Sequence, residues 1–143
     1  MRSAHCIFAA DDDEDDLMLL QAALQEAGAD CRLQTFGDGE ELLHHLNSAD
    51  QVPALVLLDL NMPVMNGFQT LQKIRQSERY QALPVIIITT SSDQRDVVRS
   101  YELGANTFLT KPANYRKFTE MMRLMSMFWL NVAKLPSHTN LVD

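Results

Sequence analysis

The sequence predicts an α/β protein built on a doubly wound, five-stranded parallel sheet. Three observations lead to this prediction. Short apolar segments alternate along the 143 residues with segments whose apolar residues recur at helical spacing. Two of the apolar segments contain no polar residue, as is typical of strands covered by helices on both faces. The connections are short, so each helix is expected to cross back to the next parallel strand.

Composition limits the classes of protein that the chain can represent. Its length suits one domain, and 46% hydrophobic with 22% charged residues is typical of a globular chain. The net charge of −7 argues against binding along a nucleic-acid backbone, which needs clustered cations. No apolar run approaches the roughly 18 residues of a membrane-spanning helix. Two cysteines form no disulfide framework and suit a reducing cytoplasm, where we expect the protein to act.

The first strand and helix flank an unusual run of acids. Residues 6–10 form the apolar strand, and residues 11–16 are all Asp or Glu. Apolar residues at helical spacing then predict a helix that Gly28 ends. The acids crowd the positive end of this helix, which favours negative charge. We expect residues 13–16 to form a solvated face.

The middle of the chain holds two further units, each with a strand, a turn or loop, and an amphipathic helix. The strand of the second of these units is continuously apolar, so it belongs in the centre of the sheet. The segments are, in order, strand Cys31–Phe36, turn 37–39, helix 40–46, strand Leu55–Leu58, loop 61–67 and helix 68–77.

Two more units complete the domain, which we place at residues 1–132. The continuously apolar segment 85–88 is the fourth strand, and Ser92 or Asp93 caps a helix that Gly104 ends. Strand Thr107–Thr110 and a helix over residues 114–132 follow. We expect the tail, residues 133–143, to be flexible, and it is too short for an output domain.

Polar residues follow the strands at the edge of the sheet where parallel folds bind ligands. Asp11 and Asp12 follow the first strand and Asp59 follows the third, whereas Thr89 and Lys111 end the fourth and fifth. Two charges ~4 Å apart repel by roughly 4 kcal/mol at an effective dielectric constant of 20, so three carboxylates require a protonated member or a cation. With no His or Cys nearby, the all-oxygen donors favour Mg²⁺.

These groups suit a tetrahedral dianion held by metal on one side and by lysine and threonine on the other. A carboxylate in such a pocket can attack phosphorus and become an aspartyl phosphate. Metal and lysine neutralise charge on the transferring group, which is most of what phosphoryl transfer requires. Asp59 is the favoured nucleophile, because it ends a fully apolar and therefore rigid strand.

Four segments together resemble the receiver domain of two-component response regulators. They are ADDDEDD (10–16), LVLLDLNMPVMNG (55–67), VIIITTSS (85–92) and FLTKP (108–112). Their order and spacing match the family over roughly residues 5–130, which makes the resemblance far more specific than any one motif. It implies the chemotaxis-regulator-like, or flavodoxin-like, strand order 2-1-3-4-5.

The resemblance assigns roles to the acidic residues. It implies that Asp59 is the phosphoacceptor and that Mg²⁺ is bound directly by Asp12, Asp59 and the backbone carbonyl of Asn61. Asp11 would act on the metal through water.

The resemblance also identifies the residues that respond to phosphorylation. The switch hydroxyl falls on Thr89, the aromatic switch position on Phe108, and the phosphate-binding lysine on Lys111. The bond between Lys111 and Pro112 is expected to be cis, as is typical of the family. Thr90 is larger than the Ala, Gly or Ser frequent at its position, which would slow access of a phosphodonor.

The resulting prediction is a stand-alone response regulator that takes a phosphoryl group from a sensor histidine kinase and signals through contacts with a downstream protein target. It catalyses only its own phosphorylation and dephosphorylation. One alternative is a degenerate receiver that binds partners without phosphorylation. Another is a phosphatase of the haloacid dehalogenase type, but that class needs an Asp two residues after the nucleophile, where Asn61 stands.

The last helix carries more apolar surface than one buried face needs. Four of the eight methionines lie between residues 121 and 127, and Leu124, Met127 and Leu130 add apolar surface on other sides. The segment FWLNVAKLP (128–136) resembles the end of the single-domain regulators that partner bacterial phytochrome kinases. We therefore expect a phytochrome-type kinase partner, and we consider a homodimer through the fourth and fifth helices.

Overall fold

The predicted sheet and strand order are confirmed. The structure is a computed structural model that describes residues 5–48 and 52–136. Its five parallel strands lie in the order β2-β1-β3-β4-β5. The strands are β1 (His5–Ala10), β2 (Cys31–Phe36), β3 (Leu55–Leu58), β4 (Val85–Thr89) and β5 (Thr107–Thr110). The helices are α1 (Glu14–Glu26), α2 (Gly39–Ser48), α3 (Gly67–Gln76), η1 (Glu78–Tyr80), α4 (Gln94–Glu102), α5 (Tyr115–Ser126) and η2 (Met127–Val132).

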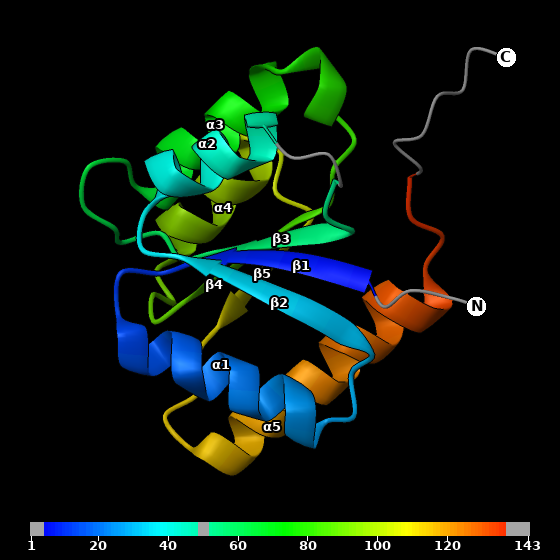
Figure 1. Cartoon of the computed structure of the whole chain (residues 1–143). Helices are drawn as coiled ribbons and strands as arrows, with labels where there is room; N and C mark the ends of the chain where they lie inside the picture. The colour runs from blue at the N-terminus through cyan, green and yellow to red at the C-terminus, as the bar shows by residue number, and fades with distance from the viewer. Residues whose placement is uncertain (1–4, 49–51, 137–143) are drawn as a thin grey trace, which may run out of the picture.

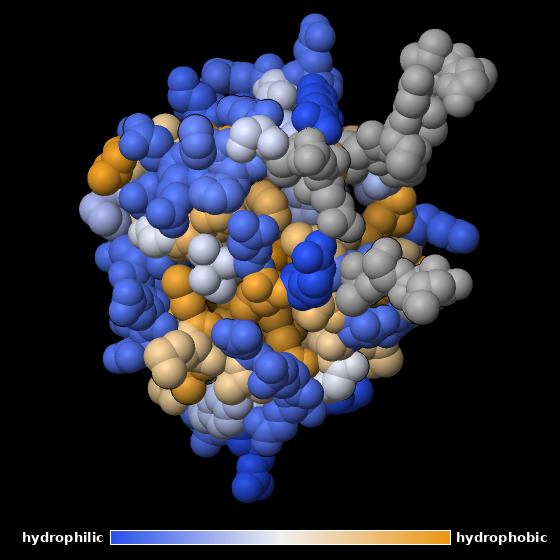
Figure 2. Space-filling view, viewed as in Figure 1, coloured by the Kyte–Doolittle hydropathy of each residue, from blue (hydrophilic) through white to orange (hydrophobic). Residues whose placement is uncertain are grey.

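Helices cover both faces of the sheet, as the continuous apolar strands require (Figure 1). Alternate side chains of β1 enter different cores: Phe8 packs with α2 and α3, whereas Ile7 packs with α1 and α5. All residues of β3 and β4 are buried, which confirms their central position. Strand β2 is an edge strand with half-buried Cys31 and Leu33, and apolar surface is visible between β2 and α1 (Figure 2).

Local sequence signals explain where most helices begin and end. The side chain of Asp93 accepts a hydrogen bond from the backbone of Arg95, so Asp93 is the cap of α4. Helices α1 and α4 are followed by Gly28 and Gly104, with φ of 77° and 106°. Only glycine adopts this left-handed conformation at little cost, so both predicted stops are confirmed.

Two helical features differ from the predicted elements. The short 3₁₀ helix η1 was not expected, and the last helix is α-helical only to Ser126 before it continues as the π-helix η2. Apolar periodicity indicates a helix but does not distinguish these hydrogen-bonding patterns. The predicted tail is described only to residue 136, so the expected flexibility of residues 137–143 lies outside the described residues.

Arg75 ties the end of α3 to the turn after α4. Its Nε and Nη2 donate to the carbonyl of Gly104 at 3.0 and 2.8 Å, and Nη2 also reaches Oδ1 of Asn106 at 3.0 Å. Its Nη1 donates to the carbonyls of Tyr80 and Leu83 at 3.2 and 2.7 Å. All five N–H donors of the guanidinium therefore have acceptors, and all of these acceptors are neutral. Burial lowers the pKa of Arg75.

Within the described ranges, no helix combines the length and the apolar character that a membrane span requires.

Candidate functional site

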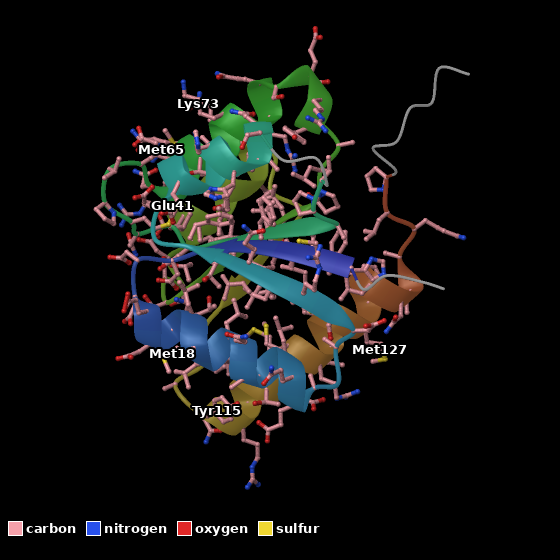
Figure 3. The ribbon with its side chains drawn as sticks, in the orientation of Figure 1. Met18, Glu41, Met65, Lys73, Tyr115 and Met127 are labelled. Atoms are coloured by element: carbon pink, nitrogen blue, oxygen red, sulfur yellow. The ribbon has the colours of Figure 1, made fainter. Side chains whose placement is uncertain are left out.

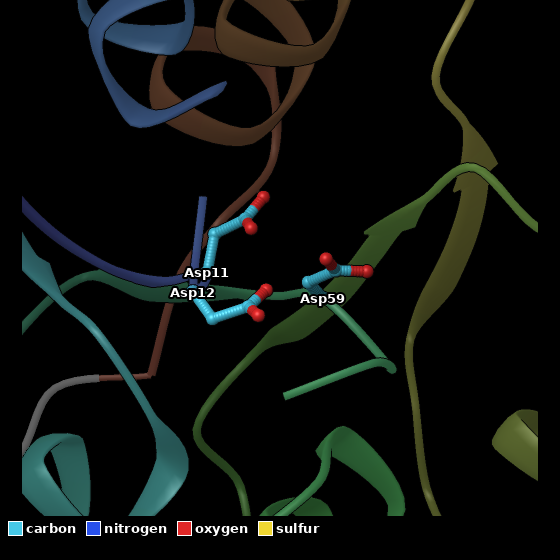
Figure 4. Close-up of side chains that lie close together, drawn as sticks. All are labelled: Asp11, Asp12 and Asp59. Atoms are coloured by element: carbon cyan, nitrogen blue, oxygen red, sulfur yellow. The ribbon is translucent and has the colours of Figure 1, made fainter. Parts of the chain in front are cut away.

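Three aspartates meet at the carboxyl edge of the sheet. Asp11 follows β1 and Asp59 follows β3, and these strands are hydrogen-bonded neighbours that pair Ala10 with Leu58. Asp11, Asp12 and Asp59 each place a carboxylate oxygen within 4.8 Å of the other two. Figure 4 shows the carboxylates of Asp11 and Asp12 on the side toward Asp59. Asp11 and Asp59 are buried, at 6% and 8% exposure, whereas Asp12 is exposed.

Lys111 lies against this cluster, as predicted. Its Nζ is 2.6 Å from Oδ2 of Asp11, 2.9 Å from Oδ2 of Asp16 and 3.6 Å from Oδ2 of Asp59. The lysine side chain is 13% exposed, so its ammonium acts in a partly desolvated setting where its charge is weakly screened. The structure thus brings one cation to the carboxylates that follow β1 and β3.

The environment changes the pKa values of Asp11 and Lys111. Burial raises the pKa of Asp11 to about 6, although the hydrogen bond from Lys111 acts in the opposite direction. Burial alone would lower the pKa of Lys111, but its hydrogen bonds to Asp11 and Asp16 raise that pKa above its ordinary value. Lys111 therefore stays positively charged across the physiological range, while Asp11 titrates just below neutral pH.

The raised pKa of Asp11 predicts a pH dependence of folding. Because the folded protein holds this proton up to about pH 6 and the unfolded chain releases it near 3.8, Asp11 lowers stability as pH rises between these values. We expect Asp11→Asn to raise the free energy of unfolding by about 2 kcal/mol more at pH 7 than at pH 4.5. Urea denaturation in metal-free buffer measures this difference, with Asp15→Asn as control. Equal shifts at both pH values would contradict the prediction.

Three hydrogen bonds hold the backbone around Asp59. The amide of Asp59 donates to the carbonyl of Ala10 at 3.0 Å, and the amide of Leu60 donates to Oδ1 of Asp59 at 2.8 Å. The amide of Gly67 donates to the carbonyl of Leu60 at 3.0 Å and closes the loop between β3 and α3. A Cβ at Gly67 would lie 2.3 Å from the carbonyl oxygen of Asp59. The loop therefore approaches the site as closely as only glycine allows.

Thr89 is the last residue of β4, whereas Phe108 lies near the start of the neighbouring strand β5, where it pairs with Ile87. The backbone carbonyl of Thr89 accepts from the amide of Lys111 at 2.7 Å. Thr89 is completely buried, and its hydroxyl has no hydrogen-bond partner among the described residues. Phe108 is half-buried against the core on the α2 and α3 side, and its amide donates to the hydroxyl of Tyr101 on α4 at 3.2 Å.

Two expectations about the site loops have different outcomes. The predicted cis bond between Lys111 and Pro112 is wrong: the structure has no cis peptide bond among the described residues. The trans isomer is the lower-energy state of an isolated X–Pro bond, by about 0.5–1 kcal/mol. Asn61 is exposed in the loop after β3, close in sequence to Asp59, so its backbone carbonyl stays a predicted metal ligand.

Asp13 and Asp16 do more than form the solvated face that we expected. Oδ1 of Asp13 accepts from the amides of Asp15 and Asp16 at 2.9 and 3.3 Å and caps α1. Asp16 pairs with Lys111 and was missed as a site residue. Its position four residues before buried Leu20 places it on the inward face of the helix, and this spacing was the available signal.

The donor set suits a divalent cation. The site offers carboxylate oxygens from three aspartates, and two of these residues are buried. Hard divalent ions such as Mg²⁺ prefer such oxygen ligands. Among the described residues, this is the group of acidic, His or Cys side chains with the spacing of a metal site. The aspartate cluster can therefore hold a divalent metal.

Comparison with known proteins agrees with this geometry. Residues 7–123 match the response regulator receiver domain family. Response regulator Rcp1 of Synechocystis is 33% identical over 136 residues, which is 92% of each chain. The phosphorylated cyanobacterial phytochrome response regulator RcpA superposes with a TM-score of 0.88 at 31% identity, covering 94% of this chain and 100% of that one. The Mn²⁺-bound form of Rcp1 superposes with a TM-score of 0.85 at 33% sequence identity, and the match covers 93% of this chain and 99% of that one. The chain belongs to the response regulator receiver domain family.

Proposed function

We propose that the chain is a stand-alone response regulator that accepts a phosphoryl group on Asp59 from a sensor histidine kinase. The observation that carries this proposal is the meeting of three carboxylates within 4.8 Å with Lys111, whose Nζ is 3.6 Å from Asp59. Among the described residues, Oδ1 of Asp59 accepts a hydrogen bond from the amide of Leu60, whereas no backbone amide donates to Oδ2. An oxygen of Asp59 is thus available as a nucleophile.

The reaction is a displacement at phosphorus. A carboxylate oxygen of Asp59 forms the new P–O bond while the P–N bond of the donor phosphohistidine breaks, and the imidazole keeps the electron pair. Lys111 stabilises the charge on the phosphoryl oxygens through its ammonium group. Asp12, Asp59 and the backbone carbonyl of Asn61 would hold Mg²⁺, with Asp11 acting through water, and the ion would supply further neutralisation of that charge.

The orphan hydroxyl of Thr89 supports a response to the new phosphate. A buried hydroxyl without a partner costs about 1–3 kcal/mol, and a phosphoryl oxygen offers a strong acceptor. Thr89 would then move toward Asp59, and Phe108 on the neighbouring strand would follow into the space. The outcome is a shift between two states of the face formed by α4, β5 and α5.

Phosphorylation by a small donor tests this function. Incubation with acetyl phosphate and Mg²⁺ should add one phosphoryl group per chain, which mass spectrometry of the intact protein detects. The group should be released by hydroxylamine, as an acyl phosphate is, and EDTA should prevent its formation. A chain that stays unmodified would favour the alternative of a phosphorylation-independent binding module. Continuous turnover of a phosphate monoester would instead favour the phosphatase.

The kinase is expected to dock beside α1 and the start of α5. A groove of about 440 Å³ there is lined by Asp16, Leu19, Lys111 and neighbouring residues, so it adjoins the lysine of the site. Leu19 in this lining is an exposed apolar residue of α1. Met18, which precedes it, is also exposed, and Figure 3 shows it on α1. Exposed apolar side chains around a polar site are typical of a protein interface. The likeness to phytochrome response regulators supports a phytochrome-type kinase.

Docking at this groove predicts a difference between two phosphodonors. We expect Leu19→Asp to slow phosphotransfer from a phosphorylated histidine kinase by about tenfold or more, because a charge replaces an apolar contact. Phosphorylation by acetyl phosphate should stay within about twofold of the wild type, since that donor needs no such surface. Gln72→Asp, which adds the same charge at an exposed position on α3, is the control. Equal loss with both donors would argue against docking at Leu19.

The homodimer through α4 and the last helix stays a prediction. Large apolar side chains are exposed on α4, the end of α5 and η2, and Phe128 is 51% exposed. They are Val98, Tyr101, Leu124, Met127, Phe128 and Val132. Sedimentation should show a concentration-dependent dimer that Phe128→Asp weakens. A monomer at high concentration, with and without a phosphoryl mimic, would contradict the dimer.

A further inference from the structure

We infer that Asp16 is a positioning residue, which fixes the ammonium group of Lys111 for phosphoryl transfer to Asp59. This inference rests on the proposed function and adds a residue to it. Oδ2 of Asp16 lies 2.9 Å from Nζ of Lys111 and forms a hydrogen-bonded ion pair with it. The two residues are 95 positions apart in the chain, and the contact joins the first turn of α1 to the segment after β5.

The distances from Nζ of Lys111 show which acceptors its N–H donors reach. An ammonium has three N–H donors, and two of them have close acceptors on Asp11 and Asp16, at 2.6 and 2.9 Å. Asp59 is farther away, at 3.6 Å. The carboxylates of Asp11 and Asp16 therefore fix the position of the Lys111 ammonium. Its third N–H donor stays available for an oxygen on the side of Asp59. That oxygen belongs to the transferring phosphoryl group in the proposed reaction.

Asp16 differs from Asp11 because, among the described residues, its carboxylate pairs with Lys111 and belongs to no group that could hold a metal ion. Asp11 also belongs to the aspartate trio that can hold a metal ion, whereas Asp16 lies outside that trio. A metal ion would attract the Asp11 carboxylate and compete with Lys111 for it. Asp16 would then be the carboxylate that keeps the ammonium in place while the metal site is filled.

The local structure makes Asp16 a firm anchor. Its side chain is 33% exposed, less than that of exposed Asp15 beside it, and its amide donates to the capping carboxylate of Asp13 at 3.3 Å. The next turn of α1 places Leu20 in the core, so the helix cannot rotate without exposing that side chain. A carboxylate on a fixed helical turn loses little freedom when it pairs with Lys111.

Three variants distinguish the positioning of Lys111 by Asp16 from a general effect of removing one negative charge from α1. Asp16→Asn removes the ion pair, Asp15→Asn removes the same charge one residue away, and Asp16→Glu keeps a carboxylate. We expect Asp16→Asn to slow phosphorylation by acetyl phosphate and Mg²⁺ about tenfold relative to Asp15→Asn, in the range that loss of a supporting contact produces. Asp16→Glu should recover part of the rate. Similar rates for Asp16→Asn and Asp15→Asn would overturn the inference.

A second measurement tests whether Asp16 affects the phosphorylation rate through Lys111. In a Lys111→Met background, Asp16→Asn should cause no further slowing, because the group that it positions is gone. An equal loss in both backgrounds would show that Asp16 acts independently of the lysine and would overturn the inference. If the wild type itself accepts no phosphoryl group, the proposed function fails. If the wild type is phosphorylated and Asp16→Asn matches Asp15→Asn, only the inference fails.

Discussion

Asp59→Asn is expected to abolish phosphorylation of the chain. The amide has nearly the same shape as the carboxylate, so the hydrogen bond from the amide of Leu60 to the side-chain oxygen can persist. An amide oxygen carries no negative charge and is a poor nucleophile toward phosphorus. Mass spectrometry after incubation with acetyl phosphate and Mg²⁺ should therefore detect no modified protein. The loss should be complete rather than partial.

The control for this variant is another aspartate of the same region. Asp15→Asn lies on α1, outside the aspartate trio, and should be phosphorylated at a rate close to that of the wild type. Circular dichroism should show that both variants are folded. If Asp59→Asn is still modified, peptide mapping would reveal an acceptor elsewhere, and the proposed role of Asp59 would be wrong.

Gly67→Ala is expected to damage both the fold and the site. The added Cβ would lie 2.3 Å from the carbonyl oxygen of Asp59 and 2.8 Å from Cα of Leu60. Both atoms belong to the backbone, so a side-chain rotation cannot relieve the clash, and the segment after β3 has to shift. We expect stability to fall by about 3 kcal/mol, at the upper end of the usual range for overpacking. Displacement of Asp59 should slow phosphorylation about 100-fold.

Gly37→Ala is a matched control for this prediction. A Cβ at Gly37 would have no atom within 4 Å, and its backbone φ lies outside the left-handed region. Alanine there should leave stability within about 1 kcal/mol and phosphorylation unchanged. Urea denaturation and the acetyl phosphate assay measure both effects. Equal behaviour of the two variants would mean that the backbone beside Asp59 tolerates the added atom.

Much of the sheet could be predicted because its signals are local. The segments Leu55–Leu58 and Thr107–Thr110 have the bounds that the sequence indicated. The first is a continuous apolar run that ends before Asp59, and the second carries two apolar residues between threonines. Parallel strands bring their carboxyl ends to one edge, so the fold class predicted that Asp11, Asp12 and Asp59 lie at the same edge. The strand order implied by the family resemblance made β1 and β3 neighbours.

The features that were missed depend on contacts distant in sequence or on backbone detail. In the acidic run, Asp15 and Asp16 are the same residue type, and only the helical phase distinguishes the one that faces Lys111. The change from α5 to the π-helix η2 leaves the apolar pattern intact, so composition does not reveal it. The expected cis bond after Lys111 came from the family resemblance, and the structure has trans.

The guanidinium of Arg75 restricts how α4 can move. Its bonds to Gly104 and Asn106 immobilise the turn at the end of this helix, whereas α4 itself buries only Ser100. A nine-residue helix is about 13 Å long, so a swing of roughly 10° about the anchored end would displace its first turn by about 2 Å. The helix would behave as a lever with its pivot at Gly104, and the end opposite the pivot is the end that follows Thr89. A partner that senses the state of Asp59 would thus find the largest displacement at the first turn of α4.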